Sequence, residues 1–258
     1  MTKASPPPVT DFAQLLQAFE RFTQNLIKLI PVVLDAVEKA APGIPSLIDA
    51  VGRMPEVLQK AIIQLADEGW YLDGHGMSLQ EPAELAEAYS EGRHQEVEDR
   101  LVAHYKRRMP EIEEELVTRF PNRAHIFRQA FNAHREGLYY LTVPTLLAQA
   151  DGAFFEQLGE YFFIRRGEES FTKLKDLDPV SKALLAPFFN RTSIRLSSHE
   201  RPDGFDGLNR HLVLHGESCD YGTEVRSLQA ISFLYYVAVI LASVVETDSR
   251  GNMEIVVS

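Results

Sequence analysis

The chain has 258 residues, of which 45% are hydrophobic and 24% charged, so its composition is that of an ordinary globular protein. This excludes collagen-like, disulfide-scaffold and wholly disordered classes. Acidic residues outnumber basic ones by 37 to 26, for a formal net charge of −11. Because nucleic-acid affinity depends on lysine and arginine neutralising phosphates, binding over a broad basic surface is excluded and only a local site is left.

Compartment signals favour the cytoplasm. The single cysteine, Cys219, cannot form a disulfide within the chain, as expected in a reducing compartment. Residues 1–10 contain three consecutive prolines and no apolar run, so no secretory signal is predicted. We therefore expect a cytoplasmic protein.

Helix signals dominate the chain and the alternation typical of strands is nearly absent, which predicts an all-α, multi-helix fold. Residues 10–30 carry the first amphipathic pattern, and repeated prolines then cut residues 32–60 into short helical pieces. Glycines around Trp70 break the chain again. The sequence therefore predicts an N-terminal helical region over residues 1–76.

Residues 77–120 are predicted to form a charged helical connector. Glu81-Pro82 begins a helix that Gly92 interrupts, and Met109-Pro110 restarts the chain. Its charges of both signs are typical of solvated helix faces.

Residues 121–258 are predicted to form a C-terminal helical bundle. Its first helix has apolar and polar residues at helical spacing, and Pro144 begins a second, largely apolar helix through Phe155. Asp178-Pro179 starts a third helix that runs to about Phe189. The spacing in the first helix rests on Ile126, Phe127, Ala130, Phe131 and His134.

The segment from Ser227 to Val245 carries no charge and is long enough to cross a bilayer, which leaves a membrane anchor as an alternative. We expect instead a helix buried in the core or in a subunit interface, because polar residues are scattered through it and no basic cluster flanks it. These polar residues are Gln229, Ser232, Tyr235, Tyr236 and Ser243.

The stretch from Asp206 to Gly216 is the most informative for function. Asp206 is predicted to cap a short helix, and Gly216 to end it in a left-handed conformation. Arg210 can bind a phosphate through two hydrogen bonds, and His215 titrates near neutral pH. About 140° of helix separates them, so they converge on one atom only by bending toward a groove or by pairing with a second copy.

Arg210 and His215 form an R-x4-6-H motif, with a polar residue and a short apolar run between them and Asn209 and Gly216 on either side. In this motif, in the helix before it and in the long apolar helix after it, residues 121–258 resemble HEPN domains. The resemblance implies an all-α bundle that dimerises. It also implies a metal-independent endoribonuclease of a bacterial toxin or phage-defence type, with no cofactor.

By position, the resemblance makes Arg210 and His215 the catalytic residues. Arg210 positions the scissile phosphate, and His215 is the general acid/base for attack by the ribose 2′-hydroxyl. Asn209 and His211 are supporting residues. The implied partners are RNA, a second copy of the chain and an antitoxin or regulatory protein, with no membrane expected. Glu217 stands where HEPN toxins silenced by a nucleotidyltransferase have a tyrosine, so that form of control is not supported.

Other interpretations of the same residues stay open. The bundle could be a non-catalytic module that binds RNA or a partner protein. The motif residues could be ordinary surface side chains, with His215 favoured by the helix dipole. His211 and His215 are four positions apart, as zinc ligands on a helix are, although no glutamate follows the first histidine.

Two further sets of residues bear on the motif. Four arginines lie within one stretch of about twenty residues, a modest local enrichment: Arg191, Arg195, Arg201 and Arg210. Asp151, late in an apolar helix, is either a partner for Arg210 or a histidine, or an ordinary polar residue at a helix end.

Overall fold

The computed structural model describes residues 44–78, 80–159, 161–163, 177 and 179–242, with the backbone alone over 44–53. The chain divides into a compact unit, Pro55–Ala242, and a second unit made of Met1–Met54 and Ser243–Ser258. The stripe predicted over residues 10–30 lies outside the described residues.

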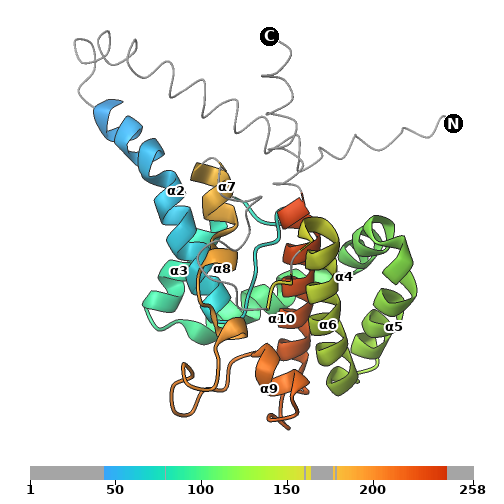
Figure 1. Ribbon diagram of the computed structural model, residues 1–258. Coiled ribbons are helices and arrows are strands. Elements are labelled where there is room, and N and C mark those ends of the chain that lie inside the picture. Colours follow the sequence, from blue (N-terminus) through green and yellow to red (C-terminus); the bar gives the residue numbers. More distant parts are fainter. Residues whose placement is uncertain (1–43, 79, 160, 164–176, 178, 243–258) are drawn as a thin grey trace, which may run out of the picture. The chain divides into compact units, whose positions relative to one another are not determined.

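Every regular element in the described part of the chain is helical and none of it is strand, so the prediction of an all-α fold is confirmed (Figure 1). The α-helices are α2 (Ile44–Asp67), α3 (Glu81–Ser90), α4 (His94–Arg119), α5 (Ala124–Arg135), α6 (Tyr139–Leu158), α7 (Pro179–Leu184), α8 (Ala186–Phe189), α9 (Arg210–Leu214) and α10 (Glu224–Tyr235). Short 3-10 turns are η1 (Pro121–Arg123) and η3 (Ser193–Arg195), and a π-helical turn, η4 (Tyr236–Ile240), continues α10.

Three of the predicted helix breaks are wrong because the helices continue through their prolines. The pieces predicted over residues 44–60 are one helix, α2, with Pro55 inside it. Pro110 lies inside α4. A proline cannot donate the hydrogen bond to the carbonyl four residues earlier, which weakens a helix unless packing holds it. Met109 and Ile112, on either side of Pro110, are both buried and supply that packing.

Helix α6 begins at Tyr139, so Pro144 lies within it rather than at its start. The carbonyl that Pro144 leaves without its usual donor is that of Tyr140. The Tyr221 hydroxyl donates to this carbonyl at 3.4 Å. A residue 81 positions away thus supplies a replacement hydrogen bond.

Two other predicted helix starts, at Glu81 and at Pro179, are confirmed. Helix α3 begins at Glu81 and ends before Gly92, whose φ is +79°. The helix predicted up to Phe189 begins at Pro179 but is split at Leu185 into α7 and α8. Asp178, its predicted cap, lies outside the described residues.

Helix α10 and η4 form the centre of the core. Residues 227–242 are buried at every position, and α10 packs against α6 and α4 (Figure 1). The polar side chains that predicted burial are hydrogen-bonded: Gln229 Nε2 donates to the Glu68 carbonyl and Ser232 Oγ to the Gln229 carbonyl, each at 2.8 Å. Burying a polar group costs little once it has such a partner.

None of the helices in the described part of the chain has the length and apolar character that crossing a bilayer requires.

Aromatic rings fill the core around Phe233. Its ring lies 4.8 Å from that of Tyr71, 5.7 Å from Phe162 and 5.9 Å from Phe163, measured between centroids. Phe233 itself is fully buried. These contacts join the residues just after α2 and α6 to the central helix.

The boundaries predicted near residues 76 and 120 both fall inside the compact unit Pro55–Ala242. Whether these boundaries separate parts of the chain that fold independently stays a prediction.

Candidate functional site

The predicted motif lies on α9, which is shorter than expected and is capped by a different residue. Asn209, rather than Asp206, is the N-cap: its side-chain oxygen accepts a hydrogen bond from the Leu212 backbone N–H at 3.1 Å. The Asp206 side chain is 98% exposed. Gly216 ends the helix with a φ of +72°, as predicted.

Asn209 is the cap because a second set of bonds fixes its side chain. Its amide nitrogen donates to the carbonyls of Ser193 and Leu196, at 2.7 and 2.9 Å, and the residue is 1% exposed. The exposed Asp206 carboxylate has no comparable fixed position. Asn209 therefore orients α9 against the turn at 193–196.

Replacing Asn209 with alanine is expected to lower the free energy of unfolding by about 2–3 kcal/mol, since the helix loses its cap, and the buried Ser193 carbonyl and the half-buried Leu196 carbonyl lose a donor. Urea denaturation followed by circular dichroism measures this. Asn122→Ala, at an exposed position in η1, is the matched control and should change stability by less than about 0.5 kcal/mol. Equal stabilities for the two variants would contradict the role given to Asn209.

Arg210 rests on an aromatic ring. Its guanidinium carbon lies 4.8 Å from the centre of the Phe163 ring, an arrangement in which the cation is attracted to the ring face. Its Nε atom is buried and has no hydrogen-bond partner among the described residues. The neighbouring ring, Phe162, carries Arg195 in the same way, at 4.6 Å.

Asp151 helps to place these rings. Its carboxylate accepts a hydrogen bond from the Phe162 backbone N–H at 3.1 Å. Neither role considered for Asp151 is seen among the described residues: it lies inside α6 rather than at its end, and its carboxylate binds the Phe162 backbone instead of Arg210 or a histidine. It thereby fixes the chain just before Phe163, the ring beneath Arg210.

His211 and His215 lie together at the end of α9. Their rings stack with centroids 5.4 Å apart and planes 19° apart. His215 is exposed and His211 half-buried. Burial, together with the charges of Arg210, His215 and Arg201, lowers the pKa of His211 below its ordinary value, so the neutral imidazole is favoured there near pH 7.

Of the four predicted site residues, His211 and His215 are thus brought into contact, while Asn209 supports the helix from its buried side. Between Arg210 and His215 the described structure has no hydrogen bond or ring contact, as their angular separation around the helix predicts. In that part of the chain, no group of three or more histidine, cysteine, aspartate or glutamate side chains is arranged to hold a metal.

Arg201 is a site residue that sequence reasoning noted only as part of the arginine enrichment. Its side chain is 11% exposed, and its Nη2 donates to the Glu217 carboxylate at 3.0 Å. Its Nη1 is buried without a hydrogen-bond partner in the described structure. Both Arg201 and Glu217 act electrostatically on His211.

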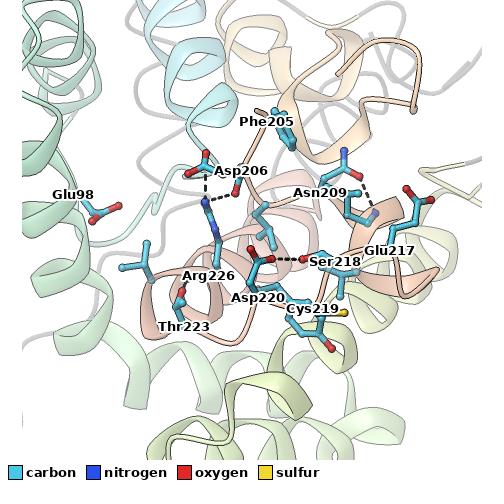
Figure 2. A pocket seen from close by; sticks show the side chains of 16 residues that line it. Glu98, Phe205, Asp206, Asn209, Glu217, Ser218, Cys219, Asp220, Thr223 and Arg226 are labelled. Carbon is cyan, nitrogen blue, oxygen red and sulfur yellow. Dashed lines mark hydrogen bonds and ion pairs between the residues drawn. The ribbon is translucent and has the colours of Figure 1, made fainter. Parts of the chain in front are cut away.

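A pocket of about 700 Å³ lies beside α9 (Figure 2). Leu212 and Val213 line it, whereas Arg210, His211 and His215 are absent from its lining. Its charged side chains are mostly carboxylates, with Arg226 the one lysine or arginine among the described lining residues. The carboxylates are Glu98, Asp206, Glu217 and Asp220. The interior of this pocket, with more carboxylates than cations, would repel a phosphate.

A second polar cluster, which sequence reasoning missed, joins the loop after α2 to α4. The Asp73 carboxylate is fully buried and accepts from His104 Nε2 at 2.7 Å and Arg108 Nε at 2.9 Å. Gly76 is required beside it, because a Cβ there would lie 2.6 Å from His104. No local pattern in the amino-acid sequence predicts such a cluster.

The cluster extends to α10 through Tyr235. The Tyr235 hydroxyl donates to the Glu115 carboxylate at 2.8 Å and lies 2.6 Å from Nδ1 of His75. Burial raises the pKa of Tyr235, and the nearby carboxylates raise it further, so the hydroxyl remains a donor. Since these groups satisfy one another, the cluster fastens the loop to the core.

Comparison with protein-family models, with curated proteins and with solved structures finds no match for this chain. The fold and site define an all-α protein with an arginine–histidine cluster on a short helix.

Proposed function

We propose that this protein is a metal-independent endoribonuclease of the HEPN type, acting in the cytoplasm in a bacterial toxin or phage-defence system. One observation carries the proposal. Arg201, Arg210, His211 and His215 gather at α9, and both arginines keep a buried nitrogen without a hydrogen-bond partner among the described residues. A phosphate oxygen is the acceptor that such donors fit best.

The two histidines fit the two proton transfers of RNA cleavage. The ribose 2′-oxygen attacks phosphorus and gives up its proton to a neutral imidazole. The resemblance assigned this step to His215, but we propose His211, because its lowered pKa favours the neutral form. The P–O5′ bond then breaks, and a protonated His215 supplies a proton to the leaving 5′-oxygen. The products are a 2′,3′-cyclic phosphate and a 5′-hydroxyl, and no metal is required.

Arg210 supplies the charge that this reaction needs. Negative charge builds on the phosphate oxygens in the transition state, and a fixed guanidinium nearby stabilises it. The Phe163 ring restrains Arg210 in one position, which lowers the cost of ordering it when RNA binds. Because Arg210 and His215 diverge around α9, the proposal includes a homodimer in which each copy completes the other's site.

His215→Ala and Arg210→Ala are each expected to reduce RNA cleavage by about 100-fold or more, because each removes a group used in the transition state. Purified protein is incubated with labelled RNA in EDTA, and the fragment ends are analysed for cyclic phosphate. His125→Ala and Arg128→Ala, at exposed positions of α5, are the matched controls and should cleave like the wild type.

The pH dependence provides a second check on the same proposal. One histidine must be neutral and the other protonated, so the rate should follow a bell-shaped profile. On its acid side the rate falls as His211 gains a proton.

A wild-type chain that binds RNA without cleaving it would replace the proposal with the non-catalytic module. Full cleavage by the His215→Ala, Arg210→Ala double variant would overturn the assignment of these residues.

A further inference from the structure

Arg201 occupies a fixed position at the end of a short turn. The Ser197 hydroxyl and backbone N–H both donate to the Glu200 carboxylate, at 2.6 and 3.0 Å, and the Arg201 N–H donates to the Ser197 carbonyl. Asn209 ties the preceding residues of this loop to α9. These bonds fix the Arg201 backbone, and the ion pair with Glu217 places its guanidinium beside the end of α9.

The partner of Arg201 is much less constrained than Arg201 itself. Glu217 is 49% exposed, against 11% for Arg201, and it follows the left-handed Gly216 just after the helix end. An ion pair with one member so exposed stabilises a protein little, because water can solvate the released carboxylate. The second guanidinium nitrogen, Nη1, stays buried without a hydrogen-bond partner among the described residues while Glu217 is in place.

We propose that Arg201 is a second phosphate-binding cation of the α9 site, and that Glu217 occupies it until a phosphate of the RNA displaces the carboxylate. The inference rests on the proposed function and specifies its substrate. Arg210 takes the scissile phosphate and Arg201 a neighbouring one, so the substrate is a strand with at least two consecutive phosphates. Carboxylate and phosphate compete because a guanidinium binds both through the same paired N–H donors.

The competition has a consequence for selectivity. A mononucleotide or a dinucleotide with one phosphodiester reaches one cation only, and leaves Glu217 on the other. A longer strand releases Glu217 and satisfies Arg201 Nη1. The net charge of −11 weakens the binding of any anion. The second contact therefore lets the protein bind an RNA strand more tightly than the abundant small phosphate compounds.

Binding of a short 2′-O-methyl oligonucleotide, which lacks the attacking hydroxyl, tests the proposal without cleavage. Fluorescence anisotropy is measured over a range of salt concentrations. We expect Glu217→Gln to tighten binding about 3- to 10-fold, and Arg201→Gln to weaken it about 10-fold while lowering the salt slope by about one. In the Arg201→Gln background, Glu217→Gln should have no further effect.

Glu87→Gln, at an exposed position of α3, removes the same charge away from α9 and is the control for net charge. If Arg201→Gln does not fold, Arg201→Lys replaces it; that variant keeps the charge without the paired donors and should weaken binding by a smaller factor. Tightening by Glu87→Gln equal to that by Glu217→Gln, or an undiminished Glu217→Gln effect without Arg201, would overturn the inference.

The outcomes separate this inference from the proposed function. If the effects of Arg201→Gln and Glu217→Gln on binding depend on each other but the wild type never cleaves RNA, the phosphate-binding site is supported and the proposed catalysis is contradicted. Cleavage that depends on Arg210 and His215 but is indifferent to Arg201 and Glu217 would do the reverse.

Discussion

Replacing Asp73 with asparagine is expected to lower the free energy of unfolding by about 3 kcal/mol, because breaking a buried ion pair from one side leaves the other charge without its partner. The carboxylate is fully buried between His104 and Arg108, and Arg108 is itself only 14% exposed. An asparagine keeps the size of the side chain but neutralises it. Urea denaturation at neutral pH measures the loss.

Asp203→Asn, at an exposed loop position, is the matched control and should change stability by less than about 0.5 kcal/mol. Equal effects from the two substitutions would show that the Asp73 cluster does not stabilise the fold.

The pH dependence of this effect has a definite sign. Burial alone would raise the pKa of Asp73, but the hydrogen bonds from His104 and Arg108 outweigh it and lower the pKa to about 2. The unfolded chain has an aspartate pKa of about 3.9. The stabilisation is therefore complete above that value and is lost as the pH falls toward about 2. The stability gap between the wild type and Asp73→Asn should narrow over this range, and a constant gap would contradict the assignment.

Phe233→Ala is expected to destabilise the chain by about 3–5 kcal/mol, the range for deleting a fully buried phenylalanine ring. The cavity would lie among Tyr71, Phe162 and Phe163. Because Phe163 carries Arg210, RNA cleavage at a temperature where the variant is still folded should also fall. Thermal and urea denaturation measure the first effect, and the cleavage assay the second.

Phe189→Ala is the matched control, since its ring is 46% exposed and its loss should cost less than about 1 kcal/mol. Phe233→Leu, which refills most of the cavity, should recover part of both losses. A Phe233→Ala chain as stable as Phe189→Ala would show that the aromatic cluster is not the core described above.

The helical character of this protein follows from its sequence, because helices depend on interactions within one or two turns. Apolar spacing over residues 124–135, the glycine at 216 and the charge-free run from Ser227 each predicted a feature that the described residues contain. The polar residues within that run predicted its burial correctly, since each such side chain described is buried and has a hydrogen-bond partner.

The sequence also singled out the motif, but only the tertiary structure decided how its residues are used. Asp206 and Asn209 are both good caps by residue type, and the choice fell to Asn209 because the carbonyls of Ser193 and Leu196 hold its side chain. Likewise, α6 continues through Pro144 with support from Tyr221, which lies far along the chain. Such partners leave no trace in the local pattern.

The supporting residues of the site and the polar cluster show the same limit. Arg210 is placed by Phe163 and Arg201 by a turn before α9, while Asp73 and His104 are 31 positions apart and His75 and Tyr235 are 160 apart. Periodicity and capping report on neighbours within about four residues. The environment of a buried charge or a restrained cation depends on which distant elements pack together, so it is decided only when the helices are assembled.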